Sequence, residues 1–117
     1  MEQKMIVTQL RNALINSFDG IKQTWKQERA FRLEILACAC ILPITFWSEA
    51  PSTHKLFVIF SLSLVLITEL INTSIEKANV ALKKTFDPLI KHSKNAASAG
   101  VFLALCLVGI SLLNLFL

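Results

Sequence analysis

The chain has 117 residues and is unusually apolar, with 54% hydrophobic and 17% charged side chains and a mean hydropathy of +0.57. A soluble domain carries about a quarter charged residues, whereas residues 35–47, 56–67 and 96–117 of this chain carry none. The net charge of +4 is therefore confined to the remaining segments. This block pattern excludes an ordinary soluble domain and predicts an all-α integral membrane protein.

The first predicted element is an amphipathic helix at residues 4–26. Its apolar side chains recur at steps of three and four, and most of its basic side chains lie away from that stripe. The stripe consists of Met5, Ile6, Leu10, Ala13, Leu14, Ser17, Phe18, Ile21 and Trp25. A basic helix of this kind is expected to lie on the membrane surface, at the level of the lipid headgroups.

Three membrane-spanning helices are predicted at residues 31–47, 56–75 and 96–117. The first ends at Trp47, a residue type enriched at membrane interfaces. The connection at residues 77–94 is polar and basic, and its Pro88 limits helix continuity. Small side chains at residues 96–100 let helices approach closely, so we expect an oligomer.

The distribution of Lys and Arg predicts the orientation of these helices. The N-terminal segment and the 77–94 connection are rich in both residues, whereas the loop at 48–54 has neither. The positive-inside rule then places the N-terminus in the cytoplasm and the C-terminus on the far side of the membrane.

A carboxylate inside the second predicted span is the strongest functional signal. Glu69 follows a long apolar run, and ionisable residues inside a membrane helix are costly and commonly functional. Asn72 lies about 60° and Glu76 about 20° from it around the helix. One face of this helix therefore carries a carboxylate, an amide and a second carboxylate at the cytoplasmic boundary.

Residues outside this face complete a plausible phosphoryl-transfer site. Glu28 precedes the first span, and with Glu76 it could share a divalent cation such as Mg²⁺, which commonly binds one or two carboxylates together with substrate phosphates. Glu69 could accept the proton of a lipid hydroxyl, and Lys94 could supply positive charge to the phosphates. The chain has three glycines and no Walker A motif or glycine-rich kinase loop, so any nucleotide site must be built differently.

Simpler interpretations remain open at this point. Glu28 could pair with Arg32 on a helix surface, Asn72 could join two helices, and Lys94 could be an ordinary cytoplasmic lysine. A small proton-coupled exporter is a further alternative, although such proteins have four spans with the carboxylate in the first.

The segment ELINTSIE, at residues 69–76, closely resembles the signature E-[LIV]-[LIV]-N-[ST]-[AS]-I-E of the prokaryotic diacylglycerol kinases and the related undecaprenol kinases. The resemblance extends to ERAFRLE at residues 28–34 and covers nearly the whole chain. It implies a surface helix, three spans and a homotrimer with active sites at subunit interfaces. It also implies transfer of the γ-phosphate of ATP to diacylglycerol, giving phosphatidic acid, in the bacterial inner membrane.

The resemblance assigns roles to individual residues. Glu69 corresponds to the catalytic base, and Glu28 and Glu76 correspond to the metal carboxylates. The ATP site would comprise Glu28, Asn72, Glu76, Asp87, Lys94 and Asn95. The lipid site would comprise Trp25, Ala30, Phe31, Arg32, Glu34, Trp47, Glu69 and Ser98.

The chain departs from the family pattern on the nucleotide side. A common Val-Val-Asp is replaced by Ala78, Asn79 and Val80, a common Lys-Asp ends here in Asn95, and Asp87 stands near a position commonly occupied by His. The loss of two carboxylates leaves a weakened or inactive homologue as an alternative, and undecaprenol as an alternative substrate.

Overall fold

The computed structural model describes residues 1–82 and 87–117, and this part of the chain is helical. Its helices are α1 (Glu2–Gln27), α2 (Arg29–Trp47), α3 (Ser52–Ala81) and α4 (Pro88–Phe116). Helices α2, α3 and α4 are each long and apolar enough to cross a membrane. The all-α architecture predicted from the sequence is therefore confirmed, with three candidate spans in the described residues.

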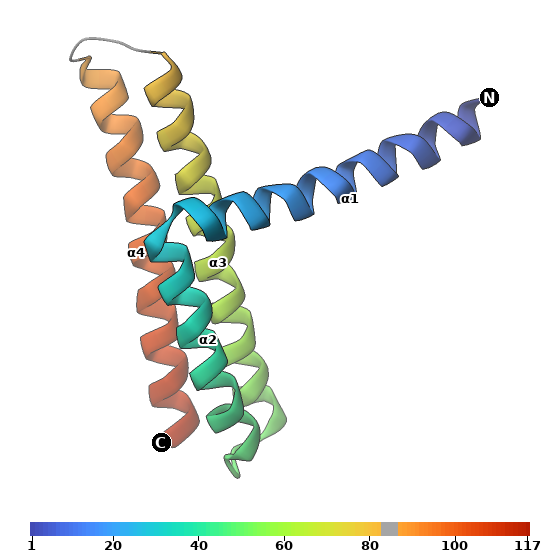
Figure 1. Cartoon of the computed structure of the whole chain (residues 1–117). Coiled ribbons are helices and arrows are strands. Elements are labelled where there is room, and N and C mark those ends of the chain that lie inside the picture. The colour runs from blue at the N-terminus through green and yellow to red at the C-terminus, as the bar shows by residue number, and fades with distance from the viewer. Residues whose placement is uncertain (83–86) are drawn as a thin grey trace.

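The three apolar helices form a bundle from which α1 projects sideways (Figure 1). Helices α3 and α4 run side by side in opposite directions, and α2 packs mainly against α3. Both α3 and α4 continue past the level at which α1 joins α2, whereas the C-terminus lies at the opposite end of the bundle.

The core of the bundle is small. Val58, Leu62 and Leu115 form its buried centre, where α3 meets α4, with Cys38 and Ile41 of α2 among the side chains packed against it. Large apolar side chains elsewhere on the spans, such as Phe60 and Phe102, are exposed. Exposing so many large apolar side chains to water would be unfavourable, whereas contact with lipid or with another subunit would bury them.

Helices α3 and α4 extend beyond the apolar segments into the 77–94 connection. Helix α3 continues to Ala81, and α4 begins at Pro88, whose ring is tolerated in a first helical turn. The Asp87 carboxylate caps α4 by accepting a hydrogen bond of 2.8 Å from the Leu89 backbone N–H. The rest of the predicted connection, residues 83–86, lies outside the described residues.

The corner between α1 and α2 is formed at a single residue. Glu28 has an extended backbone, with φ −114° and ψ 111°, and separates the two helices. Arg32, one turn into α2, donates hydrogen bonds of 2.7 and 3.0 Å to the backbone carbonyls of Trp25 and Lys26. Because the last carbonyls of a helix lack partners within it, this arginine both caps α1 and fixes where α2 begins.

Candidate active site

Glu69 lies in the middle of the site and is 6% exposed. Its neighbour across the helix interface is Glu34 of α2, whose carboxyl group lies close enough to interact with that of Glu69. One oxygen of Glu34, Oε2, is buried and has no hydrogen-bond partner among the described residues. Two adjacent carboxyl groups inside an apolar bundle, one with an unused oxygen, form an environment suited to a polar group arriving from outside the chain.

Asn72 and Glu76 continue this face of α3, as their spacing predicts. The Asn72 side-chain N–H donates a hydrogen bond of 3.3 Å to Glu76 Oε1. Asn72 is 9% exposed, and its carbonyl oxygen Oδ1 is buried without a partner among residues 1–82 and 87–117. The amide therefore orients the Glu76 carboxylate and keeps a free acceptor of its own.

Glu28 approaches the same region from the corner between α1 and α2. Both Glu28 and Glu76 lie within electrostatic range of the Glu69 carboxyl. Together with Glu34 they make up what we call the carboxylate cluster: Glu28, Glu34, Glu69 and Glu76. The fold thus joins the acidic positions of two segments, residues 28–34 and 69–76, that are distant in the sequence.

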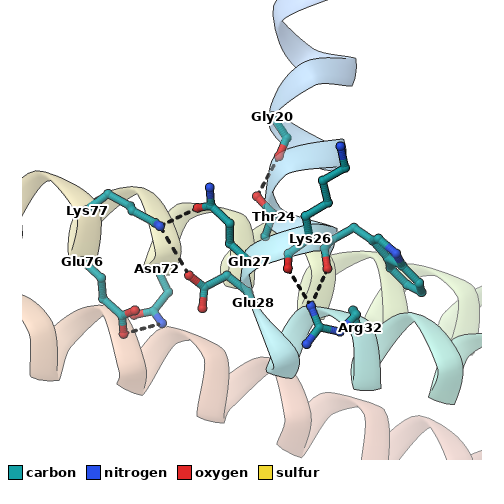
Figure 2. Close-up of polar contacts among 10 residues, drawn as sticks. Gly20, Thr24, Lys26, Gln27, Glu28, Arg32, Asn72, Glu76 and Lys77 are labelled. Atoms are coloured by element: carbon teal, nitrogen blue, oxygen red, sulfur yellow. Dashed lines mark hydrogen bonds and ion pairs between the residues drawn. The ribbon is translucent and has the colours of Figure 1, made fainter.

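Lys77 also belongs to this region, although the sequence did not indicate it. Its ammonium lies 3.8 Å from Glu28 Oε1 and donates a hydrogen bond of 2.6 Å to Gln27 Oε1 (Figure 2). Lys77 follows Glu76 directly and so points about 100° away from it around α3. Lys77 meets Gln27 because the C-terminal end of α1 lies against α3, and helical periodicity in the sequence does not predict where that end lies.

A groove of about 630 Å³ opens beside the cluster, between α1 and α3. Most of its surface is apolar, but several lining residues carry polar groups, among them Ser17, Thr24, Gln27, Thr73 and Lys77. The Thr73 hydroxyl is buried and finds no partner within the described chain. The groove therefore offers hydrogen-bonding groups next to the carboxylates at the end of the bundle where α1 attaches.

The predicted residues of α4 are not joined to the cluster within one chain. Lys94, Asn95 and Ser98 are exposed, and their side chains make no hydrogen bond or ion pair with the residues described. Asp87 caps α4 instead of contacting the carboxylates.

The predicted lipid-site residues divide into two groups. Phe31 is 2% exposed near the corner, Arg32 caps α1, and Trp25 and Ala30 are exposed beside them. Trp47, by contrast, is 85% exposed at the far end of α2. It is thirteen residues beyond Glu34, about 20 Å along the helix axis, so one chain cannot bring it to the carboxylate cluster.

A metal ion would have few protein ligands in this region. No group of three or more acidic, His or Cys side chains in residues 1–82 and 87–117 is arranged to hold an ion. Two carboxylates are nevertheless enough for Mg²⁺ when phosphate oxygens and water complete its coordination. The oxygen donors of Glu28 and Glu76, with the free Asn72 carbonyl nearby, fit an ion delivered together with a nucleotide.

Comparison with known proteins agrees with these features. Residues 15–116 match the family model for prokaryotic diacylglycerol kinase. A diacylglycerol kinase of Haemophilus influenzae is 34% identical over 89% of this chain and 88% of its own length. One from Helicobacter pylori is 38% identical over 82% of this chain and 75% of its own, and one from Escherichia coli is 29% identical over 84% and 80%. This chain therefore belongs to the prokaryotic diacylglycerol kinase family.

Proposed function

We propose that this enzyme phosphorylates diacylglycerol with ATP to give phosphatidic acid, working as a homotrimer in the bacterial inner membrane. The observation that carries the proposal is the buried Glu69, which lies beside Glu34 within the bundle and near Glu28 and Glu76 at the end where α1 attaches. A lipid substrate dissolved in the bilayer and a nucleotide dissolved in water can meet only at the boundary between the two. The names of the relatives support the choice of diacylglycerol.

Glu69 acts as the general base in this proposal. It takes the proton of the lipid hydroxyl as that oxygen bonds to the γ-phosphorus, while the bond from the γ-phosphorus to the β–γ bridging oxygen breaks and ADP leaves. The unused Glu34 Oε2 accepts a hydrogen bond from a second polar group of the lipid. The lipid reaches these carboxylates along a path flanked by Trp25, Ala30, Phe31 and Arg32.

Glu28 and Glu76 hold the divalent cation that accompanies ATP. The ion, most simply Mg²⁺, neutralises charge on the transferring phosphate when bound. Asn72 positions Glu76 through their hydrogen bond. Because Asn72 and Glu76 are one turn apart on α3, the helix itself holds them in place for this hydrogen bond.

Both the nucleotide site and the lipid site are completed across a subunit boundary. Lys94 and Asn95 of the nucleotide site and Ser98 of the lipid site are exposed on α4 and contact no carboxylate of their own described chain. In a homotrimer with sites at subunit interfaces, α4 of one subunit can supply these groups to the carboxylate cluster of its neighbour.

Helix α1 lies on the cytoplasmic surface of the membrane. Its stripe, which includes Met5, Leu10, Leu14 and Phe18, is exposed in the isolated chain, so a bilayer interface would remove it from water. The excess of Lys and Arg at the same end of the bundle supports a cytoplasmic N-terminus.

The test is a phosphorylation assay with purified protein, Mg-ATP and diacylglycerol in mixed micelles. Phosphatidic acid should form, and Glu69→Gln should lower kcat by about 10²- to 10⁴-fold, the usual contribution of a general base. Glu49→Gln, at an exposed acid in the loop between α2 and α3, is the matched control and should leave the rate unchanged. Full activity in Glu69→Gln would refute Glu69 as base.

The same assay separates the two alternatives that remain. Running it with undecaprenol shows which lipid gives the higher kcat/KM. Absence of product from both lipids, in a protein that retains its trimer, would identify an inactive homologue and refute the proposed activity.

A further inference from the structure

Lys77 forms the only ion pair found within residues 1–82 and 87–117, and its partner is one of the two proposed metal carboxylates. Its ammonium lies 3.8 Å from Glu28 Oε1, and a hydrogen bond of 2.6 Å to Gln27 holds it at the corner between α1 and α2. Figure 2 shows both contacts converging on the Lys77 nitrogen. The carboxylate that is to receive a divalent cation therefore already has a cation beside it.

Two positive groups cannot both be close partners of Glu28 without repelling each other. The ammonium and a dication a few ångströms apart interact unfavourably even with strong solvent screening. The Lys77 and Glu28 side chains are 56% and 27% exposed, so water is at hand to solvate the ammonium once it moves. Displacement is thus feasible, but it has a cost that a neutral residue at position 77 would not impose.

We propose that Lys77 is a resident counter-cation for Glu28 that competes with the divalent cation, which binds tightly only after the ammonium has left this carboxylate. This inference rests on the assignment of Glu28 and Glu76 as metal carboxylates in the proposed function. Before the ion arrives, Lys77 keeps Glu28 paired and connects the α1–α2 corner to α3. Once released, the lysine stays at the rim of the groove between α1 and α3, where a nucleotide's phosphates would offer it new negative charge.

The inference predicts that the nucleotide-free protein binds divalent cations more weakly than its carboxylates allow. Removing the Lys77 charge should strengthen binding by about threefold to tenfold, as expected for a solvent-exposed charge a few ångströms from the ion. The direction is the informative part, since damage to the fold would weaken binding instead.

The experiment measures Mn²⁺ binding to the full-length protein in lipid nanodiscs without nucleotide, by the loss of the free Mn²⁺ electron paramagnetic resonance signal. Lys77→Met and Lys77→Gln remove the charge, and the glutamine can still bond to Gln27. Lys77→Arg keeps the charge and should bind Mn²⁺ within about twofold of the unchanged protein. Lys26→Met is the matched control, because Lys26 is exposed at the end of α1 and forms no ion pair with the described residues.

Tighter Mn²⁺ binding in both neutral variants, with Lys77→Arg and Lys26→Met close to the unchanged protein, supports the inference. Glu28→Gln separates the two levels of the argument. If it weakens Mn²⁺ binding while the neutral Lys77 variants do not strengthen it, the counter-cation role is refuted and the metal site stands. If Glu28→Gln leaves a measurable Mn²⁺ affinity unchanged, the metal assignment and the inference are both overturned. If no variant binds Mn²⁺ measurably without nucleotide, Lys77 has no ion to compete with in the nucleotide-free protein and the inference alone is overturned.

Discussion

At the scale of the residue, the site depends on how side chains one turn apart constrain each other. Asn72 is nearly buried and donates one hydrogen bond to Glu76, and its carbonyl oxygen has no partner in the part of the chain that the structure describes. Groups that orient a metal ligand are often nearly as important as the ligand itself. The Asn72 amide is therefore the clearest example of a residue that acts through another in this chain.

We expect Asn72→Ala to weaken metal-nucleotide binding more than it slows the chemical step. Loss of an orienting partner typically costs about 10- to 100-fold in metal affinity, so KM for Mg-ATP should rise by about tenfold or more while kcat changes less. Steady-state kinetics at varied Mg-ATP measures this split. Asn12→Ala, at an exposed amide on α1, is the control. A fall in kcat with an unchanged KM would argue against an orienting role.

The sequence predicted the residues of this face better than their partners. Glu69, Asn72 and Glu76 share a helix, so helical periodicity alone places them together. The approach of Glu34 to Glu69 and of Lys77 to Glu28 depends on how separate helices pack. Periodicity within one helix carries no information on that packing. Of these cross-helix partners, the family resemblance pointed to Glu28 and Glu34 but not to Lys77.

At the scale of the element, the apolar helices were predictable, but the extension of α3 and α4 into the 77–94 connection was not. Uninterrupted apolar runs identify α2, α3 and α4 because the bilayer requires such runs. Helix α4 begins at Pro88, well before the apolar segment at 96–117, because Asp87 caps it and proline suits a first turn. Polar composition marked residues 77–94 as a connection, but the backbone hydrogen bonds of α3 and α4 continue beyond their apolar segments, to Ala81 and from Pro88.

Two buried serines link α3 to α4. Ser61 and Ser111 are both 0% exposed, and their hydroxyls are 2.9 Å apart. Each hydroxyl also lies within hydrogen-bond distance of a carbonyl of its own helix, Val58 and Val108 respectively. Because each serine has one proton, one hydroxyl donates across the two helices while the other donates to its own carbonyl. Hydroxyl pairs between membrane helices are worth about 0.6 kcal/mol on average and up to about 1.7 kcal/mol.

We therefore predict that Ser61→Ala and Ser111→Ala each lower the free energy of unfolding by about 0.5–1.5 kcal/mol. The double variant should lose less than the sum of the two, because the second substitution has no hydrogen bond between the helices left to break. Unfolding in mixed micelles with increasing sodium dodecyl sulfate measures this coupling. Ser63→Ala, an exposed serine on the same helix, is the control. Strict additivity would mean that the hydroxyl pair contributes nothing.

At the scale of the whole molecule, a single chain presents half of the proposed site. The carboxylate cluster is built from the α1–α2 corner, α2 and α3, whereas the predicted residues of α4 are exposed and without contacts among the residues described. Only about a third of the large apolar span in α3 and α4 is buried within the chain, which leaves wide faces for lipid or for other subunits. Sequence periodicity cannot distinguish these two kinds of apolar neighbour, because both favour the same side chains.

If sites form between subunits, two inactive variants should restore each other. Glu69→Gln removes the base, and Lys94→Met removes the cation expected from the neighbouring α4. In an equal mixture reassembled into trimers, a site works when its Glu69 comes from a Lys94→Met subunit and its Lys94 from a Glu69→Gln subunit. In a closed ring of head-to-tail interfaces this holds for roughly a quarter of the sites, so roughly a quarter of full activity should return. The recovered phosphorylation rate after mixing measures this directly. The control is Glu69→Gln mixed with Glu76→Gln. Both residues lie on the same α3, so each site takes both from one subunit, every subunit in the mixture lacks one of them, and no activity should return. An inactive mixture of the first pair would place Lys94 in the same subunit's site and would contradict an active site shared between chains.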